Sequence, residues 1–397
     1  MNPPRINPLP FAARRLSSSY ADRTVAAPDR MSRHGSLFAV TPSVAPCGIE
    51  VFACALAKAL AAADPAGGYG LLVVSPRWRD LPGTLRRMLQ ARQVVFNLPL
   101  VAWKRMIGIP FVILLAAVLC GRRVTLILHE WSGMHRLRRL VVAPYVLLSS
   151  RILLLSPFIR GQIARDAVMA RVTAKCRLIP HPPTINRPAV PVPPTPAVRQ
   201  VEQATHGSDV VIGHFGSIYN GKACIALLDV CAELKRRGIR ASLVYIGGFT
   251  KSLDGYEGEF RARVAALGLE HDVIVTGHIA DEKELFALFE RIGIFLYLFP
   301  EGLTARRSSV IACLQSGKPV LVSAPQSDDE FAHHSHLRAV ITSGALSFVS
   351  RSARVPEICD RLLSEHGRGD RPTTAIDEAA WWQATTTATR AALQSTR

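Results

Sequence analysis

Residues 299–323, FPEGLTARRSSVIACLQSGKPVLVS, combine side chains that suit a ligand carrying both phosphate and hydroxyl groups. A carboxylate accepts hydrogen bonds from sugar hydroxyls. Serine hydroxyls and helix N–H groups suit phosphate oxygens, and arginine contacts them with paired hydrogen bonds. The pattern therefore predicts a binding turn between a strand and a helix. The residues assigned to it are Glu301, Gly302, Leu303, Thr304, Arg306, Arg307, Ser308 and Ser309.

Two readings of this turn stay open. Arg306 and Arg307 are adjacent and are expected to point to different sides, so that one of them contacts a given phosphate. The alternative is a capped helix start with solvated arginines.

A second candidate loop lies in GHFGSIYNGKACIALLDV, residues 213–230. A predicted strand ends at Gly216, Ser217 follows, and Lys222 precedes a predicted helix. Glycine lets the backbone approach a ligand closely, and a helix start with a lysine attracts an anion. The spacing is not that of a P-loop. A strand–turn–helix corner with a solvated lysine is the alternative.

The first half of the chain offers two further candidates. His129 and Glu130 end the predicted strand RVTLILHE, where a histidine can donate to a bound hydroxyl or orient a sugar. Gly48 opens a predicted helix after the loop SVAPC and can approach a bound substrate. A capping or core role for the histidine, and a plain helix start at the glycine, are the alternatives.

These candidates follow strands of two similar halves. Apolar strands alternate with helical patterns in each half, which predicts α/β domains with doubly wound parallel sheets. In such sheets ligands bind beyond the carboxyl ends of the strands. We expect a disordered extension at 1–34, a domain at 35–183, an extended Pro-rich linker at 184–206, a domain at 207–374 and a C-terminal helix at 375–397.

The charge distribution indicates an anionic partner. The chain of 397 residues carries a formal charge of +18. Between Arg77 and Arg177 there are eighteen Lys or Arg residues and only three acidic ones. The apolar runs 107–120 and 140–155 in this region are too short or too interrupted to span a bilayer. Basic and apolar residues together favour a membrane-surface face, and a buried helix flanked by solvated arginines is the alternative.

The cysteine pattern and the N-terminal sequence indicate the cellular compartment in which the protein works. The eight cysteines show neither a C-x-x-C pair nor zinc spacing, and no signal peptide is visible. We therefore expect a reducing, cytoplasmic location, and Met31 as an alternative start. The cysteines expected to be buried in helices are Cys54, Cys120, Cys224, Cys231 and Cys313.

The ordered set of motifs resembles the GT-B glycosyltransferases, in particular retaining family 4. The pieces are PCGIEVF near the start, the strand ending in His129-Glu130, the loop from Gly216-Ser217 to Lys222, and the pairing of Glu301-Gly302 with Gly317-Lys318-Pro319-Val320. The resemblance runs from about Ser43 to Trp381.

The sequence departs from the family at three places. Cys47 replaces a glycine of the first motif, and Ser217 stands where the phosphate loop has an arginine, so Arg306 or Arg307 is expected to supply that charge. The family's second glutamate is missing, because Ala312 and Ser309 occupy its candidate positions. This last change puts the ribose contact in question. An inactive paralogue is one reading of it.

The resemblance implies two Rossmann-like domains facing a central cleft, and retaining transfer of a sugar from a nucleotide-sugar. It implies catalytic roles for His129 and Glu301, with no metal or other cofactor, and a sugar or acceptor side at Gly48, Glu130, Gly302 and Leu303. The donor diphosphate would meet Gly216, Ser217, Lys222, Thr304, Arg306, Arg307, Ser308 and Ser309. Together with the basic face, the resemblance favours a lipid-linked acceptor at the inner face of the cytoplasmic membrane, in polysaccharide or glycolipid synthesis.

A sugar-nucleotide epimerase of the same fold is the alternative. Nucleic-acid binding is disfavoured because no recognition motif is present.

Overall fold

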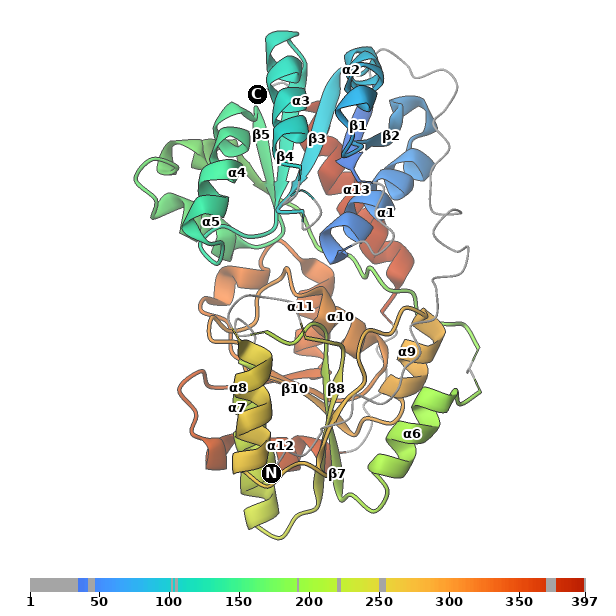
Figure 1. Cartoon of the computed structure of the whole chain (residues 1–397), viewed down its shortest axis with the longest axis vertical. Coiled ribbons are helices and arrows are strands. Elements are labelled where there is room, and N and C mark those ends of the chain that lie inside the picture. The colour runs from blue at the N-terminus through green and yellow to red at the C-terminus, as the bar shows by residue number, and fades with distance from the viewer. Residues whose placement is uncertain are drawn as a thin grey trace. The chain divides into compact units, whose positions relative to one another are not determined.

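The computed structural model describes residues 35–41, 47–100, 103, 106–190, 193–219, 223–249, 255–368 and 376–395. Their contacts form two compact units. The N-terminal unit contains the described residues up to Thr184, together with Asp329–His334 and the residues from Glu378 onward. The C-terminal unit contains Ile185–Asp328 and Ser335–Asp377. Figure 1 shows strands and helices alternating in each unit.

The N-terminal unit is built on a six-stranded parallel sheet in the order β2-β1-β3-β4-β5-β6. Every residue of β1 and β3 is buried, as expected for strands covered on both faces. The strands are β1 (Ser36–Val40), β2 (Tyr69–Val73), β3 (Gln93–Leu98), β4 (Arg123–Leu128), β5 (Arg151–Leu154) and β6 (Cys176–Leu178).

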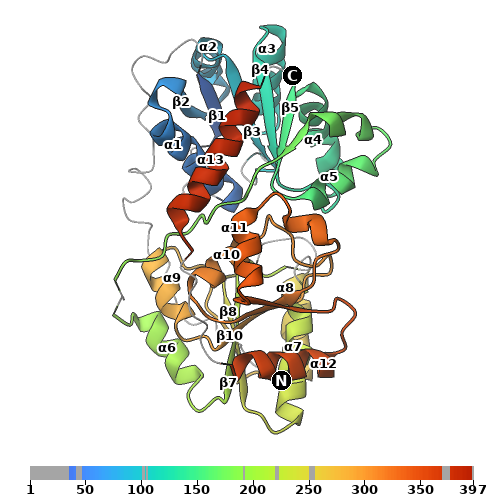
Figure 2. The same ribbon diagram turned by 180° about the vertical axis from the view of Figure 1, so that it is seen from behind.

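Helices cover both faces of this sheet. One face packs against α1 and α13, and α13 is seen crossing that face in Figure 2. The opposite face packs against α2, α3, α4 and α5. The helices are α1 (Gly48–Ala63), α2 (Leu81–Gln90), α3 (Gly108–Leu119), α4 (Arg136–Leu148), α5 (Pro157–Ala164) and α13 (Glu378–Gln394), with 3-10 turns η2 (Pro65–Gly67), η3 (Trp78–Asp80) and η5 (Ala170–Lys175).

The C-terminal unit repeats this plan with the strand order β12-β11-β10-β7-β8-β9, again parallel. Its strands are β7 (Val210–Phe215), β8 (Ala241–Ile246), β9 (Val273–Val275), β10 (Ile294–Tyr297), β11 (Val320–Ser323) and β12 (Leu346–Val349). Its helices are α6 (Pro196–Ala204), α7 (Cys224–Arg236), α8 (Tyr256–Ala266), α9 (Glu282–Phe289), α10 (Ser308–Gln315), α11 (Ser335–Thr342) and α12 (Val355–His366). The 3-10 turn η7 (Asp328–Phe331) follows β11.

Local signals in the sequence explain several helix ends. The Asp281 side chain accepts a hydrogen bond from Lys283 N at the start of α9, a capping position that aspartate favours. Gly238, with a φ of 77°, follows the end of α7, a position that glycine favours. The Pro-rich linker differs from expectation, because its last part is the helix α6. Pro196 is compatible with the first helical turn, where its missing N–H needs no partner, and Thr195 caps that turn.

Three of the five cysteines expected to be buried are buried: Cys224, Cys231 and Cys313. Cys54 is half-buried. Cys120 is exposed, and this part of the expectation is wrong. The apolar pattern around Cys120 continues onto the solvent-facing side of α3, so the pattern alone did not reveal which side faces the core.

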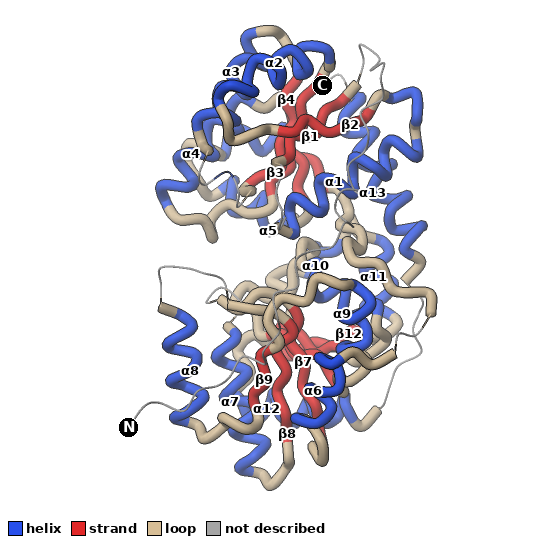
Figure 3. The backbone as a smooth tube through the Cα atoms, turned by 45° about the vertical axis from the view of Figure 1, so that its right-hand side comes forward, coloured by secondary structure: helices blue, strands red, loops and turns tan. Residues whose placement is uncertain are grey.

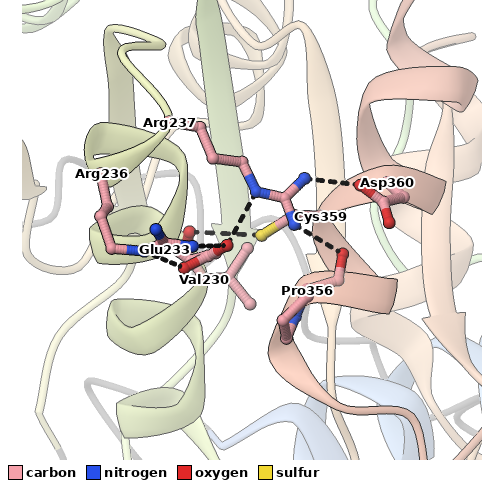
Figure 4. Close-up of polar contacts among 7 residues, drawn as sticks. All are labelled: Val230, Glu233, Arg236, Arg237, Pro356, Cys359 and Asp360. Carbon is pink, nitrogen blue, oxygen red and sulfur yellow. Dashed lines mark hydrogen bonds and ion pairs between the residues drawn. The ribbon is translucent and has the colours of Figure 1, made fainter.

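An ion-pair network joins α7 to α12 in the C-terminal unit (Figure 4). The Glu233 carboxylate accepts hydrogen bonds from Arg236 and Arg237, and Arg237 reaches across to Asp360 at 2.5 Å. Arg237 also donates to the Pro356 carbonyl oxygen. These hydrogen bonds lower the pKa of Glu233 to about 2. The packing of α12 on α7 is thus coupled to an ionised carboxylate.

Glu233 should make the stability of the C-terminal unit sensitive to acid. Its folded-state pKa is depressed, so its contribution is present above the ordinary carboxyl pKa and is lost as the pH falls toward about 2. Glu233→Gln should therefore lower the urea midpoint more at pH 6 than at pH 3, where part of the contribution is already lost. Glu257→Gln is the control, because Glu257 pairs within its own helix, with Arg261 of α8. An equal loss for Glu233→Gln at both pH values would contradict this prediction.

Candidate functional site

The strand order brings the two loops predicted to bind phosphate to neighbouring positions. β10 pairs in parallel with β7, with Ile294 opposite Ile212. The carboxyl ends of both strands therefore meet at one edge of the sheet, where the Glu301–Ser309 turn follows β10 and Gly216 follows β7. The N-terminus of α10 lies at this same end, because that helix follows the turn. The two loops predicted to bind phosphate therefore lie at one edge of the sheet in the C-terminal unit.

Glycine residues form the neighbouring part of this edge. β7, β8 and β9, side by side in Figure 3, are followed by Gly216, Gly247 and Gly277, with φ angles of 120°, 152° and 76°. A Cβ on Gly247 would lie 2.1 Å from the Gly216 carbonyl oxygen. A side chain is thus excluded where the two loops meet. Gly216 was predicted, whereas the pair Gly247-Gly248 was not, although a double glycine after a strand could have signalled a close approach.

Tyr297 fixes the end of β10 against β7 and α10. Its hydroxyl donates to the Phe215 carbonyl oxygen at 3.0 Å and accepts from Phe215 N at 3.2 Å. The same oxygen lies 3.2 Å from Cys313 Sγ of α10. Burial raises the pKa of Tyr297 well above its usual value, and a hydrogen bond with the Ser309 side chain opposes this shift. The Ser309 hydroxyl, predicted to meet phosphate, is thus engaged within the protein here.

Glu301, Arg306 and Arg307 form a single charged cluster after β10. Both arginines contact the same carboxylate oxygen, Glu301 Oε1, with Arg306 Nη2 at 3.4 Å and Arg307 Nη2 in close contact. The guanidinium of Arg307 also lies over the Phe299 ring, 4.2 Å from its centroid. The expectation that the arginines diverge is wrong. The two arginines precede α10, which begins at Ser308, and the irregular turn there lets both reach Glu301.

Three buried polar atoms in and beside this cluster lack a partner within the described part of the chain. Thr304 Oγ1, Arg306 Nε and Arg307 Nε have no hydrogen-bond partner among the residues that the structure describes. Thr304 is 2% exposed and Arg307 is 8% exposed. A buried donor without an acceptor costs about 1–3 kcal/mol, so such groups are uncommon in folded proteins. Three such atoms lie within residues 304–307.

Other predicted residues of the turn have structural contacts. Gly302 has a φ of 76°, and a Cβ there would lie 2.1 Å from the Ala324 carbonyl oxygen. Leu303 is 1% exposed, and its N–H donates to the Ser323 carbonyl oxygen. These two residues hold the turn against β11. Ser308 begins the eight-residue helix α10, whose N-cap side chain makes no capping hydrogen bond among the described residues.

The loop after β7 is described only in part. Ser217 follows Gly216, and Ile218 N donates to the Gly248 carbonyl oxygen at 2.9 Å, which joins this loop to the one after β8. Lys222 lies outside the described residues, and its assignment to the phosphate site stays a prediction. α7 starts at Cys224, after Ala223, which has a φ of 49°.

In the N-terminal unit, His129 lies where β4 ends. Its backbone N–H donates to the Leu98 carbonyl oxygen at 2.9 Å. Its ring packs edge to face against Phe52 of α1, with ring centroids 5.4 Å apart. His129 is 7% exposed. The structure therefore places it at the predicted strand end and against α1, the helix that Gly48 opens.

Glu130 and Gly48 are more accessible than His129. Glu130 is half-buried, and its carboxylate folds back over Gly133, where a Cβ would meet Glu130 Oε1 at 2.2 Å. Gly48 is exposed, with open space where a Cβ would lie. The acid two residues later, Glu50, is 1% exposed and accepts hydrogen bonds from Thr41 N and Oγ1 at 2.9 and 2.6 Å. Glu50 therefore ties the start of α1 to the end of β1.

One further cluster in the N-terminal unit was not predicted from the sequence. The carboxylate of Glu330 accepts hydrogen bonds from Ser156 Oγ at 2.5 Å and from Phe158 N at 3.2 Å, and so occupies the N-terminus of α5. His334 Nε2 donates to the His181 carbonyl oxygen at 2.8 Å. Burial lowers the pKa of His181 to about 4, which keeps its ring neutral at pH 7. The stretch EFAHHSH carries no recognisable motif, and these contacts depend on tertiary structure.

Neither a metal cluster nor a membrane-spanning helix is found in the part of the chain that the structure describes. Within those ranges, no three His, Cys, Asp or Glu side chains are grouped so that they could hold a metal ion. None of the helices in the same ranges is both long and apolar enough to cross a bilayer.

Comparison with known proteins identifies the fold. No protein-family model matches the sequence, and no curated protein matches it. Among solved structures, HepE of Anabaena in complex with UDP is 14% identical, with a TM-score of 0.59 over 90% of this chain and 97% of that chain. Sucrose-phosphate synthase of Thermosynechococcus elongatus is 15% identical, with a TM-score of 0.56 over 91% and 96%. A glycosyltransferase of Rickettsia africae is 12% identical, with the same TM-score and coverage. The chain has the fold of the GT-B glycosyltransferases, as the motif order implied.

Proposed function

We propose that this protein is a glycosyltransferase that moves a sugar from a nucleotide-sugar to a saccharide acceptor with retention of configuration. The observation that carries the proposal is the group of buried polar atoms at Thr304, Arg306 and Arg307 that lack partners among the described residues. The neighbouring loops contain glycines where a side chain would not fit. A diphosphate supplies the acceptor oxygens that these atoms need. HepE, a protein of the same fold, has been crystallised with UDP and with UDP-glucose, which supports a nucleotide-sugar donor.

The donor would bind to the C-terminal unit. Its diphosphate would lie between the N-terminus of α10 and the loop at Gly216-Ser217, with Lys222 adding a further positive charge. Positive groups fixed in place before the reaction stabilise the charge that develops on a leaving diphosphate. In this proposal, protein groups supply that stabilisation without a metal ion. Both arginines contact Oε1 of Glu301, so Oε2 is the oxygen that would accept a hydrogen bond from a sugar hydroxyl.

The acceptor would bind to the N-terminal unit. Gly48 offers an exposed helix start, and His129 and Glu130 follow the end of β4. A histidine here would orient a sugar hydroxyl by hydrogen bonding. The basic character of this half favours a lipid-linked acceptor, and hence a protein peripheral to the inner face of the cytoplasmic membrane, acting in polysaccharide or glycolipid biosynthesis.

A thermal-shift screen over nucleoside diphosphates and their sugars tests the donor site. A ligand that binds only the folded state raises its stability, by about 2.7 kcal/mol at a hundredfold excess over Kd. We expect at least one nucleoside diphosphate to raise the melting temperature, and the matching monophosphate to raise it less. If no nucleotide shifts the transition, the proposed donor site is wrong.

The stabilising nucleotide-sugar, radiolabelled, then tests the reaction. Incorporation of label into a lipid extract in the presence of membranes supports transfer to a lipid-linked acceptor. Isomerisation of the sugar within the nucleotide, without any acceptor, would indicate an epimerase instead.

A further inference from the structure

Helix α4 of the N-terminal unit carries an apolar stripe that faces solvent. Leu137 and Leu140 are 69% and 71% exposed, and Leu147 and Leu148 are 44% and 40% exposed. Pro144, between the two pairs, is half-buried. Spacings of three and four residues place these side chains along one side of a helix.

The core-facing side of α4 is a different set of residues. Val142, Tyr145 and Val146 are at most 3% exposed and belong to the core beneath the helix. The packing of α4 against its own unit therefore uses these three side chains and not the leucines of the stripe. A helix that is apolar on both sides normally has a partner on each side.

Helix α3 carries further exposed apolar side chains. It follows β3 as α4 follows β4, and both helices pack on the same face of the sheet. Leu115 and Leu119 are 36% and 84% exposed, and Ile107, just before the helix, is 47% exposed. The Trp78 ring, 60% exposed, lies beside Gly108 at the start of α3. Tryptophan with leucine and isoleucine is the composition of membrane-interface surfaces.

The charges around these helices are basic. Arg136, exposed, begins α4, and Lys175 lies at its end, where its Nζ donates to the Leu147 and Ser149 carbonyl oxygens at 3.1 and 3.0 Å. Arg122 and Arg123 follow α3, and Arg86 is exposed on α2.

The three acidic residues of this region are engaged locally. Asp80 accepts a hydrogen bond from Ser75 Oγ at 2.6 Å, and Asp166 accepts from Val168 N at 3.2 Å. The charge of Glu130 acts on Arg138 and raises its pKa, against the larger lowering effect of burial. The apolar surface is therefore bordered by cations whose charge nearby carboxylates offset only in part.

We propose that the outer face of α3 and α4, together with Trp78, is the surface on which this protein docks to an anionic lipid bilayer. Leucine side chains enter the region between headgroups and acyl chains, while the arginines and lysine meet lipid phosphates. This inference rests on the proposed function, whose acceptor is lipid-linked. It names the contact surface, on which Arg136 is exposed whereas Arg138 and Arg139 are half-buried.

Charge complementarity selects a bilayer over the other occupants of such a face. A nucleic acid would use the cations and leave four exposed leucines of α4 in water. A second copy of this chain would bring the same basic border against itself, which is unfavourable. An anionic bilayer satisfies both the apolar stripe and its basic border.

Vesicle flotation with the full chain tests this proposal. Wild-type protein should float with vesicles of phosphatidylglycerol and phosphatidylcholine, and less with phosphatidylcholine alone. The double variant Leu137→Ser/Leu140→Ser should bind the anionic vesicles at least about tenfold more weakly, because two apolar side chains no longer enter the bilayer. Val190→Ser is the matched control, since Val190 is 71% exposed, like Leu140, but lies outside this face. It should bind like wild type.

Three further measurements identify the occupant. The double Leu variant should elute from heparin like wild type, because its charge is unchanged, and should keep the thermal shift given by the stabilising nucleotide. Loss of vesicle binding with the nucleotide shift retained separates docking from donor binding. Sedimentation without lipid should show the same oligomeric state for wild type and variant, whereas a wild-type dimer that the variant dissociates would assign the face to a second copy and overturn the proposal.

Cys120, exposed at the end of α3, offers a local readout. With Cys47 and Cys54 changed to Ser, a polarity-sensitive fluorophore on Cys120 should shift to the blue when anionic vesicles are added. The proposal is wrong if wild type fails to bind anionic vesicles, if the Leu variant binds them as well as wild type does, or if the probe on Cys120 does not respond while the protein floats.

Discussion

Replacing both Arg306 and Arg307 by alanine should lower the affinity for the nucleoside diphosphate by at least about 100-fold, because two charge-assisted hydrogen-bonding groups of about 1.5–3 kcal/mol each are lost. The arginines are 16% and 8% exposed, so water does little to screen them. Isothermal titration of the stabilising nucleotide measures the change. We also expect weaker discrimination between diphosphate and monophosphate.

Two control variants make this result specific. Arg354→Ala removes an arginine whose side chain is 82% exposed and which pairs with Glu357, and it should leave the affinity unchanged. Glu301→Gln keeps both arginines and should largely retain nucleotide binding while it lowers turnover, because the group proposed to meet the sugar is altered. If the double arginine variant, still folded by circular dichroism, bound the nucleotide like wild type, the cluster would be structural only.

The second large effect is expected from Gly302→Ala. At this position φ is 76° and a Cβ would lie 2.1 Å from the Ala324 carbonyl oxygen, which is backbone and can move only with β11. We expect a loss of more than about 3 kcal/mol in unfolding free energy, since strain and collision add. Urea denaturation measures it.

Gly277→Ala is a closely matched control for this variant. Gly277 has the same φ of 76°, but no described atom lies within 4 Å of the position that a Cβ would take there. Its cost should be only the left-handed backbone strain of about 1–2 kcal/mol. Equal losses in the two variants would show that the contact between the turn and β11 is not what requires glycine at position 302.

Much of the fold follows from local signals in the sequence. The alternating apolar strands were predicted from a few residues each, and the structure confirms them. Aspartate at the start of a helix and glycine after its end, as at Asp281 and Gly238, are signals of the same local kind. The helix α6 was missed because prolines were taken to exclude a helix, although Pro196 stands at a first-turn position that tolerates it.

The candidate site was predictable in its residues but not in its contacts. Glu301, Arg306 and Arg307 were singled out by type, yet their convergence on one carboxylate oxygen depends on the irregular turn before α10. The meeting of Gly216 with Gly247 depends on β7 pairing with β8, and Tyr297 reaches Phe215 across 82 positions of sequence. Pairings between distant segments are set by packing of the whole unit, which no local pattern encodes.

The leucines of α4 show the same limit. The sequence run 140–155 is apolar almost throughout, whereas the structure divides it between α4 and β5 and turns Leu140 outward. Composition predicted a basic, apolar half, and only the burial of each side chain shows which residues form its surface.

A crystal structure of the protein with the stabilising nucleoside diphosphate tests the central claim most directly. We predict that the phosphates lie within hydrogen-bond distance of Arg306 or Arg307 and of backbone N–H groups at Ser308 or Ser309, beside Gly216. A nucleotide bound anywhere else, with Thr304 and both arginines arranged as they are without it, would contradict the account.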